Sequence, residues 1–187
     1  MRIISGEFKG KKIFFLKSVT TRPLKDSVKE NIFNILIHSN LINISLEKSY
    51  ILDLYSGVGS FGLECISRGA NNITFVEKDK SVIQILNKNL LNLMIQNKAI
   101  VENDEIINFL NKKNKRKFDI IFLDPPFKQN FFIHELQLIH KKKIYKNNHI
   151  VVIHRERNSD DNLDNIINTL IVKNYGRSKV IIGKFLG

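Results

Sequence analysis

Two groups of residues in this sequence have the types and spacing that chemistry requires, and the first is Asp124-Pro125-Pro126-Phe127. It follows a mostly apolar run, residues 118–123, that is typical of a buried strand. Two successive prolines fix φ at both positions and hold the loop in one shape. The Asp124 carboxylate and the Pro125 carbonyl are hydrogen-bond acceptors, and Phe127 offers an aromatic face. This combination is suited to holding the planar exocyclic amine of a base.

The second group is a glycine-rich segment, residues 57–62, between a predicted strand and a predicted helix. Gly57 and Gly59 allow a tight turn and a close approach of the backbone to a ligand. Gly62 allows the helix to pack close to the strand. Such a segment in this context predicts a nucleotide cofactor. NAD-binding domains share the spacing and are the alternative.

Three acidic residues lie at predicted strand ends, and the first of them favours S-adenosylmethionine (SAM) over NAD. Asp53 could hold an ammonium group, and Glu77 is placed to accept hydrogen bonds from ribose hydroxyls. Asp104 could accept from an adenine amino group, although helix capping is its alternative role. SAM carries an ammonium and no phosphate, and nothing beyond an ordinary helix start points to a pyrophosphate site. We therefore expect Asp53, Gly57, Gly59, Glu77 and Asp104 to bind SAM.

Together the two groups predict methyl transfer from SAM to the amino group of a base. The lone pair of such an amine is delocalised into the ring, so catalysis must localise it and align it with the methyl group. Asp124 and the Pro125 carbonyl could each accept a hydrogen bond from one N–H of the amine, and the carboxylate would stabilise the positive charge that grows on nitrogen. Phe127 could stack on the base, which must be unpaired or flipped out of a duplex.

Composition and charge favour a nucleic-acid partner. The chain has 187 residues and a net charge of +12, which suits binding to a polyanion, although a Lys-rich composition from an AT-rich genome would also produce it. The single cysteine, Cys65, excludes an internal disulfide and is expected in the core. The histidines show no ligand spacing, so we expect no metal site. With no apolar stretch of membrane-spanning length and no signal peptide, we expect a cytoplasmic monomer without membrane contact.

The apolar pattern predicts one α/β domain with a doubly wound, Rossmann-like and mostly parallel sheet. From residue 49, runs typical of strands buried on both faces alternate with helical periodicities. The expected strands are 49–54, 72–76, 99–102, 118–123 and 149–153, and the expected helices are 60–68, 80–95, 105–111 and 131–142. The tail differs, because residues 168–175 and 178–186 read as an antiparallel hairpin at the sheet edge. Residues 158–167 fit either a loop or a short helix.

The N-terminal part is expected to be a small extension of this domain. Residues 2–5 and 11–16 predict a hairpin around Gly6–Gly10, and residues 17–25 an exposed loop. A helix should follow, with Asp26 as its N-cap and an end near Ser39.

With these motifs placed, nearly the whole chain resembles the RsmD family, the bacterial guanine-N2 methyltransferases of 16S ribosomal RNA. Many amino-methyltransferases share the two motifs, so the N-terminal block is the more specific part. The residues that carry the resemblance are Met1 to Gly6, Lys9-Gly10-Lys11, Arg22-Pro23 with Asp26, Val28 to Asn34, Gly62-Leu63-Glu64 and Ser67 to Ala70.

The resemblance implies SAM as methyl donor and one guanine of the small-subunit RNA as target, within an assembled or partly assembled subunit. It implies residues 1–40 as an RNA-docking extension and residues 41–187 as the catalytic core. The RNA-docking residues would be Arg2, Lys9, Lys11, Arg22 and Lys29. The family usually has arginine at positions 27 and 29, where this chain has Ser27 and Lys29, and a lysine cannot make the bidentate phosphate contact of an arginine.

Other functions stay open at this point. A DNA or RNA adenine-N6 methyltransferase can carry the same Asp-Pro-Pro-Phe motif, but a DNA enzyme would normally have a separate target-recognition segment. A methyltransferase for a protein amide or a small molecule fits the basic N-terminal block poorly. A non-catalytic ribosome assembly factor that retains a SAM pocket is the alternative from another class of protein, and SAM affinity would distinguish it.

Overall fold

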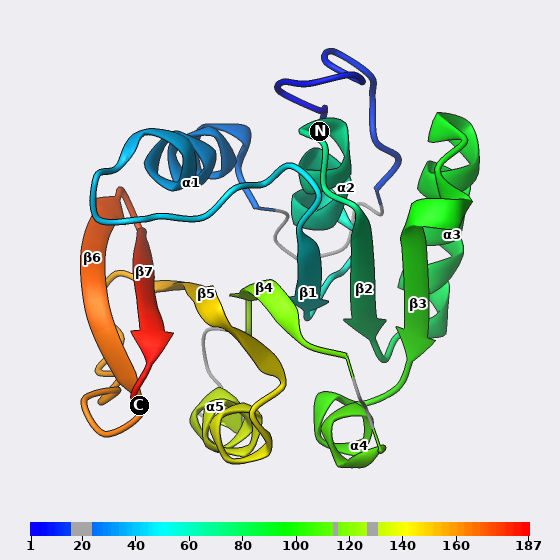
Figure 1. The fold of residues 1–187 in the computed structure, drawn as a ribbon. Helices are drawn as coiled ribbons and strands as arrows, with labels where there is room; N and C mark the ends of the chain where they lie inside the picture. Colours follow the sequence, from blue (N-terminus) through cyan, green and yellow to red (C-terminus); the bar gives the residue numbers. More distant parts are fainter. Residues whose placement is uncertain (16–23, 114–115, 127–130) are drawn as a thin grey trace.

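The structure of the protein, a computed structural model, describes residues 1–15, 24–113, 116–126 and 131–187. A seven-stranded sheet with the order β3-β2-β1-β4-β5-β7-β6 forms its centre (Figure 1). The strands are β1 (Tyr50–Leu54), β2 (Asn72–Glu77), β3 (Ala99–Asn103), β4 (Phe118–Leu123), β5 (Tyr145–Glu156), β6 (Ile167–Tyr175) and β7 (Ser178–Phe185). The first five are parallel, and β6 and β7 form an antiparallel hairpin on β5. The expected fold class is confirmed.

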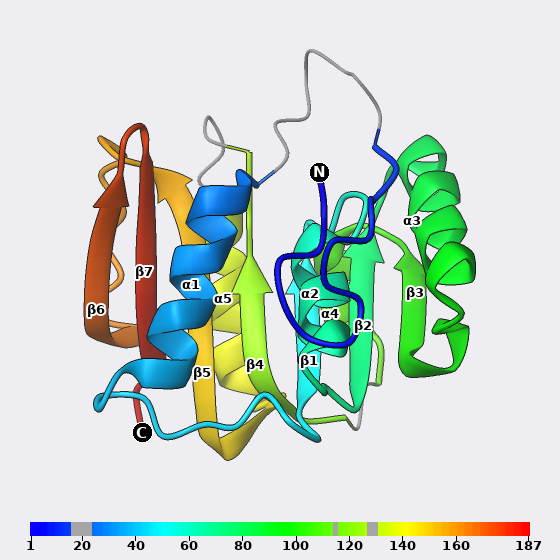
Figure 2. The same cartoon turned by 90° about the horizontal axis from the view of Figure 1, so that it is seen from above.

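Helices cover both faces of the sheet, as a sheet buried on both sides requires (Figures 1 and 2). On one face lie α1 (Asp26–His38), α2 (Ser60–Ser67) and α3 (Lys80–Leu93). The opposite face carries α4 (Ile106–Asn111) and α5 (Phe131–Lys142), and a short 3-10 helix, η1 (Gln96–Lys98), precedes β3. Each face has its own apolar core, because strand residues alternate between the two.

The register of the parallel strands brings their carboxyl ends to one edge. Leu54 of β1 pairs with Val76 of β2 on one side and with Leu123 of β4 on the other. Leu123 also pairs with Ile153 of β5. The residues that follow these four positions are therefore neighbours, although they come from segments far apart in the sequence. Ligands of open α/β sheets bind at such an edge.

The N-terminal segment differs from the expected pair of strands. Its two ends come together as a hairpin, but the pairing is a single antiparallel bridge between Arg2 and Lys12. The segment's backbone bonds partly to itself, as from the Ile3 amide to the Lys11 carbonyl at 3.0 Å, and partly to α2, where the Glu7 amide donates to the Ser67 carbonyl at 2.8 Å. The segment lies against α2 because this helix satisfies its amides (Figure 2).

The start of α1 differs from the prediction, and the structure of residues 158–166, which the sequence left open, is a loop. Helix α1 begins at Asp26, but the N-cap is Lys25, so Asp26 lies in the first turn, where its charge suits the helix dipole. Residues 158–166 form a loop with turns and no helix.

Candidate active site

A cavity of about 570 Å³ opens at the carboxyl ends of β1, β2 and β4. This volume is in the range of sites for cofactors and other small molecules. Its walls are strongly acidic, with the carboxylates of Asp53, Glu77, Asp104, Glu105, Asp124 and Glu135. Lys78 is the single lysine among the described residues of its lining. A protein with a net charge of +12 therefore concentrates negative charge in this cavity.

The glycine segment forms one wall of the cavity in the predicted way. Gly57 and Gly59 have positive φ values of 55° and 87°, a conformation that favours glycine. A Cβ atom on Gly62 would lie 2.3 Å from the Phe75 ring of β2, so glycine is needed for α2 to pack against this strand. The loop and the helix start are thus held close to the sheet.

Asp53 ends inside the cavity as a buried and incompletely bonded carboxylate. Its side chain is 1% exposed, and Oδ2 accepts a hydrogen bond from the Gly62 amide at 3.0 Å. Within the described part of the chain, Oδ1 has no hydrogen-bond partner. Burial raises the pKa of this carboxyl well above its usual range, and the nearby Asp124 and Glu77 raise it further. A buried anion in this setting is suited to a cationic ligand group such as an ammonium.

Glu77 and Asp104 lie on the same side of the cavity. Glu77 Oε2 accepts from the Gly57 amide at 3.0 Å, and Oε1 accepts from the amides of Lys78 and Asp79. These bonds fix the carboxylate beside the glycine loop. Asp104 forms an ion pair with Lys112 at 3.0 Å, which lowers the pKa of its carboxyl. Of the five residues predicted to bind the cofactor, Asp53, Gly57, Glu77 and Asp104 line the cavity, whereas Gly59 lies in the same loop and faces the side chains of Leu86 and Phe75.

On the other side of β1, Asp124 is held by a histidine. His154, which lies near the end of β5, places Nδ1 2.7 Å from Asp124 Oδ1. Pro125 is buried and Pro126 contributes to the cavity wall, whereas Phe127 lies outside the described residues.

A buried arginine supports the loop after Asp124. Arg155 is fully buried, and its guanidinium donates to both carboxylate oxygens of Asp161 and to the Pro126 carbonyl. It also lies over the Phe132 ring, 4.3 Å from the centroid. These contacts tie β5 and α5 to the loop, so Arg155 is a positioning residue that the sequence did not reveal.

Tyr55 and Glu135 complete this side of the cavity and were also missed. The Tyr55 hydroxyl donates to Glu135 Oε2 at 2.6 Å across 80 residues of sequence. Tyr55 directly follows β1, so its place at the carboxyl edge could have been inferred. Nothing local distinguishes Glu135 from the other polar residues of α5.

The predicted RNA-docking residues separate into two kinds. Arg2, Lys9 and Lys11 are exposed, and Arg22 lies outside the described residues. Lys29 is a correction, because its side chain is fully buried between α1 and α2 and cannot reach a phosphate in this conformation. Its ammonium donates to the Arg2 carbonyl at 2.8 Å and to Ser60 Oγ at 3.3 Å.

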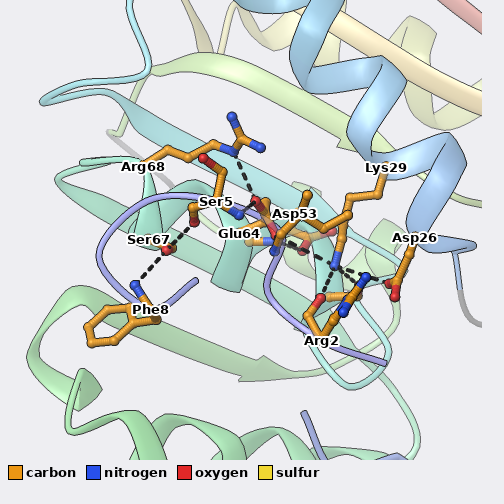
Figure 3. Close-up of polar contacts among 12 residues, drawn as sticks. Arg2, Ser5, Phe8, Asp26, Lys29, Asp53, Glu64, Ser67 and Arg68 are labelled. Carbon is orange, nitrogen blue, oxygen red and sulfur yellow. Dashed lines mark hydrogen bonds and ion pairs between the residues drawn. The ribbon is translucent and has the colours of Figure 1, made fainter. Parts of the chain in front are cut away.

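Lys29 belongs to a buried ionic cluster centred on Glu64 (Figure 3). Glu64 Oε2 accepts from the Ile4 amide, and Oε1 accepts from the Ser5 amide and from Arg68 Nε at 2.9 Å. The Lys29 ammonium lies 3.6 Å from Glu64 Oε2, and burial lowers its pKa. The cluster therefore fastens the N-terminal segment to α1 and α2.

No group of three or more His, Cys, Asp or Glu side chains in the described ranges is placed to hold a metal ion. None of the helices in these ranges has the length and apolar character needed to cross a membrane.

This protein has the fold of SAM-dependent methyltransferases. Its strand order, its glycine loop and its acidic cavity are those of this class of enzyme. The solved structure of "Putative methyltransferase yhhF from Escherichia coli" matches all of this chain and 98% of its own, with a TM-score of 0.85 and 26% identity. A methyltransferase structure described as complexed with SAH shares the fold over 81% of this chain and 49% of its own, with a TM-score of 0.63 and 15% identity.

The chain belongs to the family described as "Conserved hypothetical protein 95", whose family model matches residues 1–184. "Ribosomal RNA small subunit methyltransferase D" of Buchnera aphidicola subsp. Baizongia pistaciae is 35% identical over 181 residues, which cover 97% of this chain and 88% of that protein. The resemblance to the RsmD family is thereby confirmed.

Proposed function

We propose that this protein transfers a methyl group from SAM to the exocyclic N2 amine of a guanine in small-subunit (16S) ribosomal RNA. The observation that carries the proposal is the cavity at the carboxyl edge of the sheet. In this cavity, Asp53 lies beside the glycine loop with a hydrogen bond from the described residues to only one of its carboxylate oxygens. It is close enough to Asp124 for the two charges to interact. A site for a cationic cofactor and a site for an amine therefore adjoin each other.

The charge of the cavity supports SAM over NAD. The described lining of the cavity has six carboxylates and one lysine, so it would repel a pyrophosphate, which needs backbone amides or cations around it. SAM carries a sulfonium and an ammonium, and both are favoured near carboxylates. Asp53 would hold the ammonium through Oδ1. Glu77 would accept from the ribose hydroxyls and Asp104 from the adenine amine, with Gly57 and Gly59 allowing close approach.

The residues around Asp124 account for the chemistry of the acceptor. SAM, when bound, supplies an electrophilic methyl group. Asp124 would accept a hydrogen bond from one N–H of the amine and the Pro125 carbonyl from the other, which localises the nitrogen lone pair. His154 bonds to one carboxylate oxygen of Asp124 and leaves the second for the base. Phe127, on the same loop, would stack on the base.

The names of the relatives support ribosomal RNA as the substrate, and the resemblance supports guanine N2. The exposed Arg2, Lys9 and Lys11 of the N-terminal segment fit contacts with phosphates. We propose that residues 1–40 dock RNA on the core of residues 41–187, with Arg22 taking part. A monomer acting on a small subunit or an assembly intermediate in the cytoplasm is the simplest form of this function.

Labelled methyl transfer tests the proposal. Undermethylated small subunits would be incubated with methyl-labelled SAM and digested to nucleosides. We expect label in N2-methylguanosine, and we expect Asp124→Ala to abolish transfer while SAM binding is retained. Asp164→Ala, which removes an exposed carboxylate from the loop before β6, is the matched control and should keep full activity.

The other outcomes separate the alternatives. Label in N6-methyladenosine would overturn the guanine assignment and leave the cofactor in place. Absence of transfer from a folded protein that binds SAM would favour an assembly factor that retains the pocket. Absence of SAM binding at micromolar concentration would overturn the proposal as a whole.

A further inference from the structure

A second carboxylate on the base-binding side of the cavity has one oxygen available for a ligand. Glu135 of α5 lines the cavity with a side chain that is only 5% exposed. Its Oε2 is bound by the Tyr55 hydroxyl, whereas no described residue hydrogen-bonds to Oε1. Burial raises the pKa of this carboxyl, while the hydrogen bond from Tyr55 lowers it. The second oxygen of this nearly buried carboxylate is suited to a donor group of a ligand.

The strand register places Tyr55, which holds this carboxylate, beside Asp124. Tyr55 and Asp124 directly follow Leu54 and Leu123, which are paired residues of neighbouring strands. Adjacent strands are about 5 Å apart, so the Tyr55 and Asp124 backbones are close neighbours. The Tyr55 hydroxyl then reaches Glu135 on the helix that covers this end of the sheet. We therefore expect Glu135 to be the next polar group along the edge of a base that Asp124 holds.

We propose that Glu135, held by Tyr55, accepts a hydrogen bond from N1–H of the target base and thereby selects guanine over adenine. The inference rests on the proposed function, because it concerns the same base. Glu135 becomes a specificity-determining residue, distinct in role from Asp124, which holds the amine.

Base chemistry gives the reason for this selectivity. In guanine the N2 amine has the N1–H donor as its ring neighbour on one side. In adenine both ring neighbours of the amine that can form hydrogen bonds, N1 and N7, are acceptors, and in cytosine the neighbour N3 is an acceptor. A carboxylate beside the amine site thus matches guanine and repels the others. An unpaired acceptor against a buried charge is penalised strongly, because neither group can reach water.

The decisive variant is Glu135→Gln, which has the same shape. Its amide oxygen can still accept from Tyr55, and its NH₂ group then presents a donor where the carboxylate presented an acceptor. We expect a loss of roughly ten- to a hundredfold in kcat/KM for the guanine of undermethylated subunits, from the usual value of one base contact. The Kd for SAM should stay within about twofold of the wild-type value, since Glu135 lies on the base side.

Two further substitutions sharpen the test. Tyr55→Phe removes only the hydroxyl that orients Glu135, so we expect a smaller loss of the same kind, about threefold to tenfold. Glu47→Gln changes an exposed carboxylate before β1 and serves as the matched control with unchanged kinetics. The same variants would be assayed on subunits whose target guanine, once mapped, is replaced by adenine. On these adenine substrates, the ratio of the kcat/KM of Glu135→Gln to that of wild type should be higher than the same ratio on guanine.

The outcomes distinguish this inference from the function on which it rests. If wild type forms N2-methylguanosine and Glu135→Gln matches it within twofold on both substrates, the role of Glu135 is overturned while the proposed function stands. A loss that arises from weaker SAM binding would also overturn it and would assign Glu135 to the cofactor. If the wild-type protein forms no N2-methylguanosine, both proposals fail together.

Discussion

Two of the groups of buried charges among the described residues, the cluster centred on Glu64 and the acids of the cavity, differ in how completely they are hydrogen-bonded. In the cluster centred on Glu64, both carboxylate oxygens have backbone and cationic partners, and Lys29 is enclosed with them. In the cavity, Asp53 Oδ1 has no partner among the described residues. The two acids are 11 positions apart in sequence, and both contact α2 or form part of it.

The difference teaches which buried charge serves structure and which serves a ligand. A saturated cluster lowers the free energy of the folded state only while every member is present. An unsaturated carboxylate raises the free energy of the ligand-free protein and lowers it again when a cation binds. Burial alone does not separate the two, since Glu64 and Asp53 are both almost fully buried.

Glu64→Ala should produce the largest effect on stability. The change leaves the Lys29 ammonium without its closest buried counter-ion and the Ile4 and Ser5 amides without an acceptor. We expect the free energy of unfolding to fall by about 3–5 kcal/mol. Urea denaturation would measure it, with exposed Glu47→Ala as a control that costs less than about 0.5 kcal/mol. A loss below about 1 kcal/mol would contradict the structural role.

Asp53→Asn should weaken ligand binding without lowering stability, in contrast to Glu64→Ala. The amide oxygen can still accept from the Gly62 amide, while the buried charge disappears. We expect SAM affinity to fall by about 1.5–3 kcal/mol, the value of a hydrogen bond to a charged group. The ligand-free variant should melt at the same temperature as wild type or a few degrees higher. Calorimetric titration and thermal melts would check both, and a variant that loses stability together with affinity would contradict the comparison.

Gly62→Ala tests the packing on which both regions depend. The new Cβ would lie 2.3 Å from the Phe75 ring, so α2 must move away from β2. We expect a cost of about 1–3 kcal/mol in the free energy of unfolding, typical of an overpacked core. Gly187→Ala, at the chain end where the described residues leave open space, is the control. Equal stability of the two variants would mean that α2 adjusts without strain.

The dependence of SAM affinity on pH should be the smallest effect. Because the pKa of Asp53 is raised in the ligand-free fold, that fold binds more protons than the unfolded chain, and its stability falls as pH rises from about 4 through the raised pKa. The ammonium favours the ionised carboxylate, so SAM should bind more tightly over the same rise. For one titrating group, the affinity for SAM can change by at most about tenfold per pH unit, which corresponds to 1.4 kcal/mol. Titrations below pH 7 would show the slope, and Asp53→Asn should flatten it.

Much of the fold was predictable because it depends on local patterns. Apolar runs bounded by turns identified all the parallel strands, and β2 was expected at 72–76 and lies at Asn72–Glu77. Cys65 was expected in the core and is fully buried. The N-terminal segment was predicted as two strands, but the amides of Ile4, Ser5 and Phe8 bond to side chains of α2, a partner that no local pattern reveals.

Lys29 shows where a local pattern was available and was not used. The buried residues of α1 are Val28, Lys29, Ile32, Phe33 and Leu36, a stripe at helical spacing. Lys29 lies on this stripe, so its burial could have been suspected. The family resemblance and the basic character of the N-terminal block instead suggested RNA, and neither shows which way a side chain points.

The sequence by itself determined the alternation of strands and helices, the glycine loop, and the acids at the ends of the strands. These features follow from periodicity, backbone freedom and the position of a residue after a strand, all of which are local. Only the tertiary structure decided that His154 bonds to Asp124, that Tyr55 bonds to Glu135, and that Lys29 bonds inward. Such contacts join segments 27 to 80 residues apart, and their geometry is set by the strand register and by helix packing. Whether a buried charge is saturated or open to a ligand depends on those distant partners.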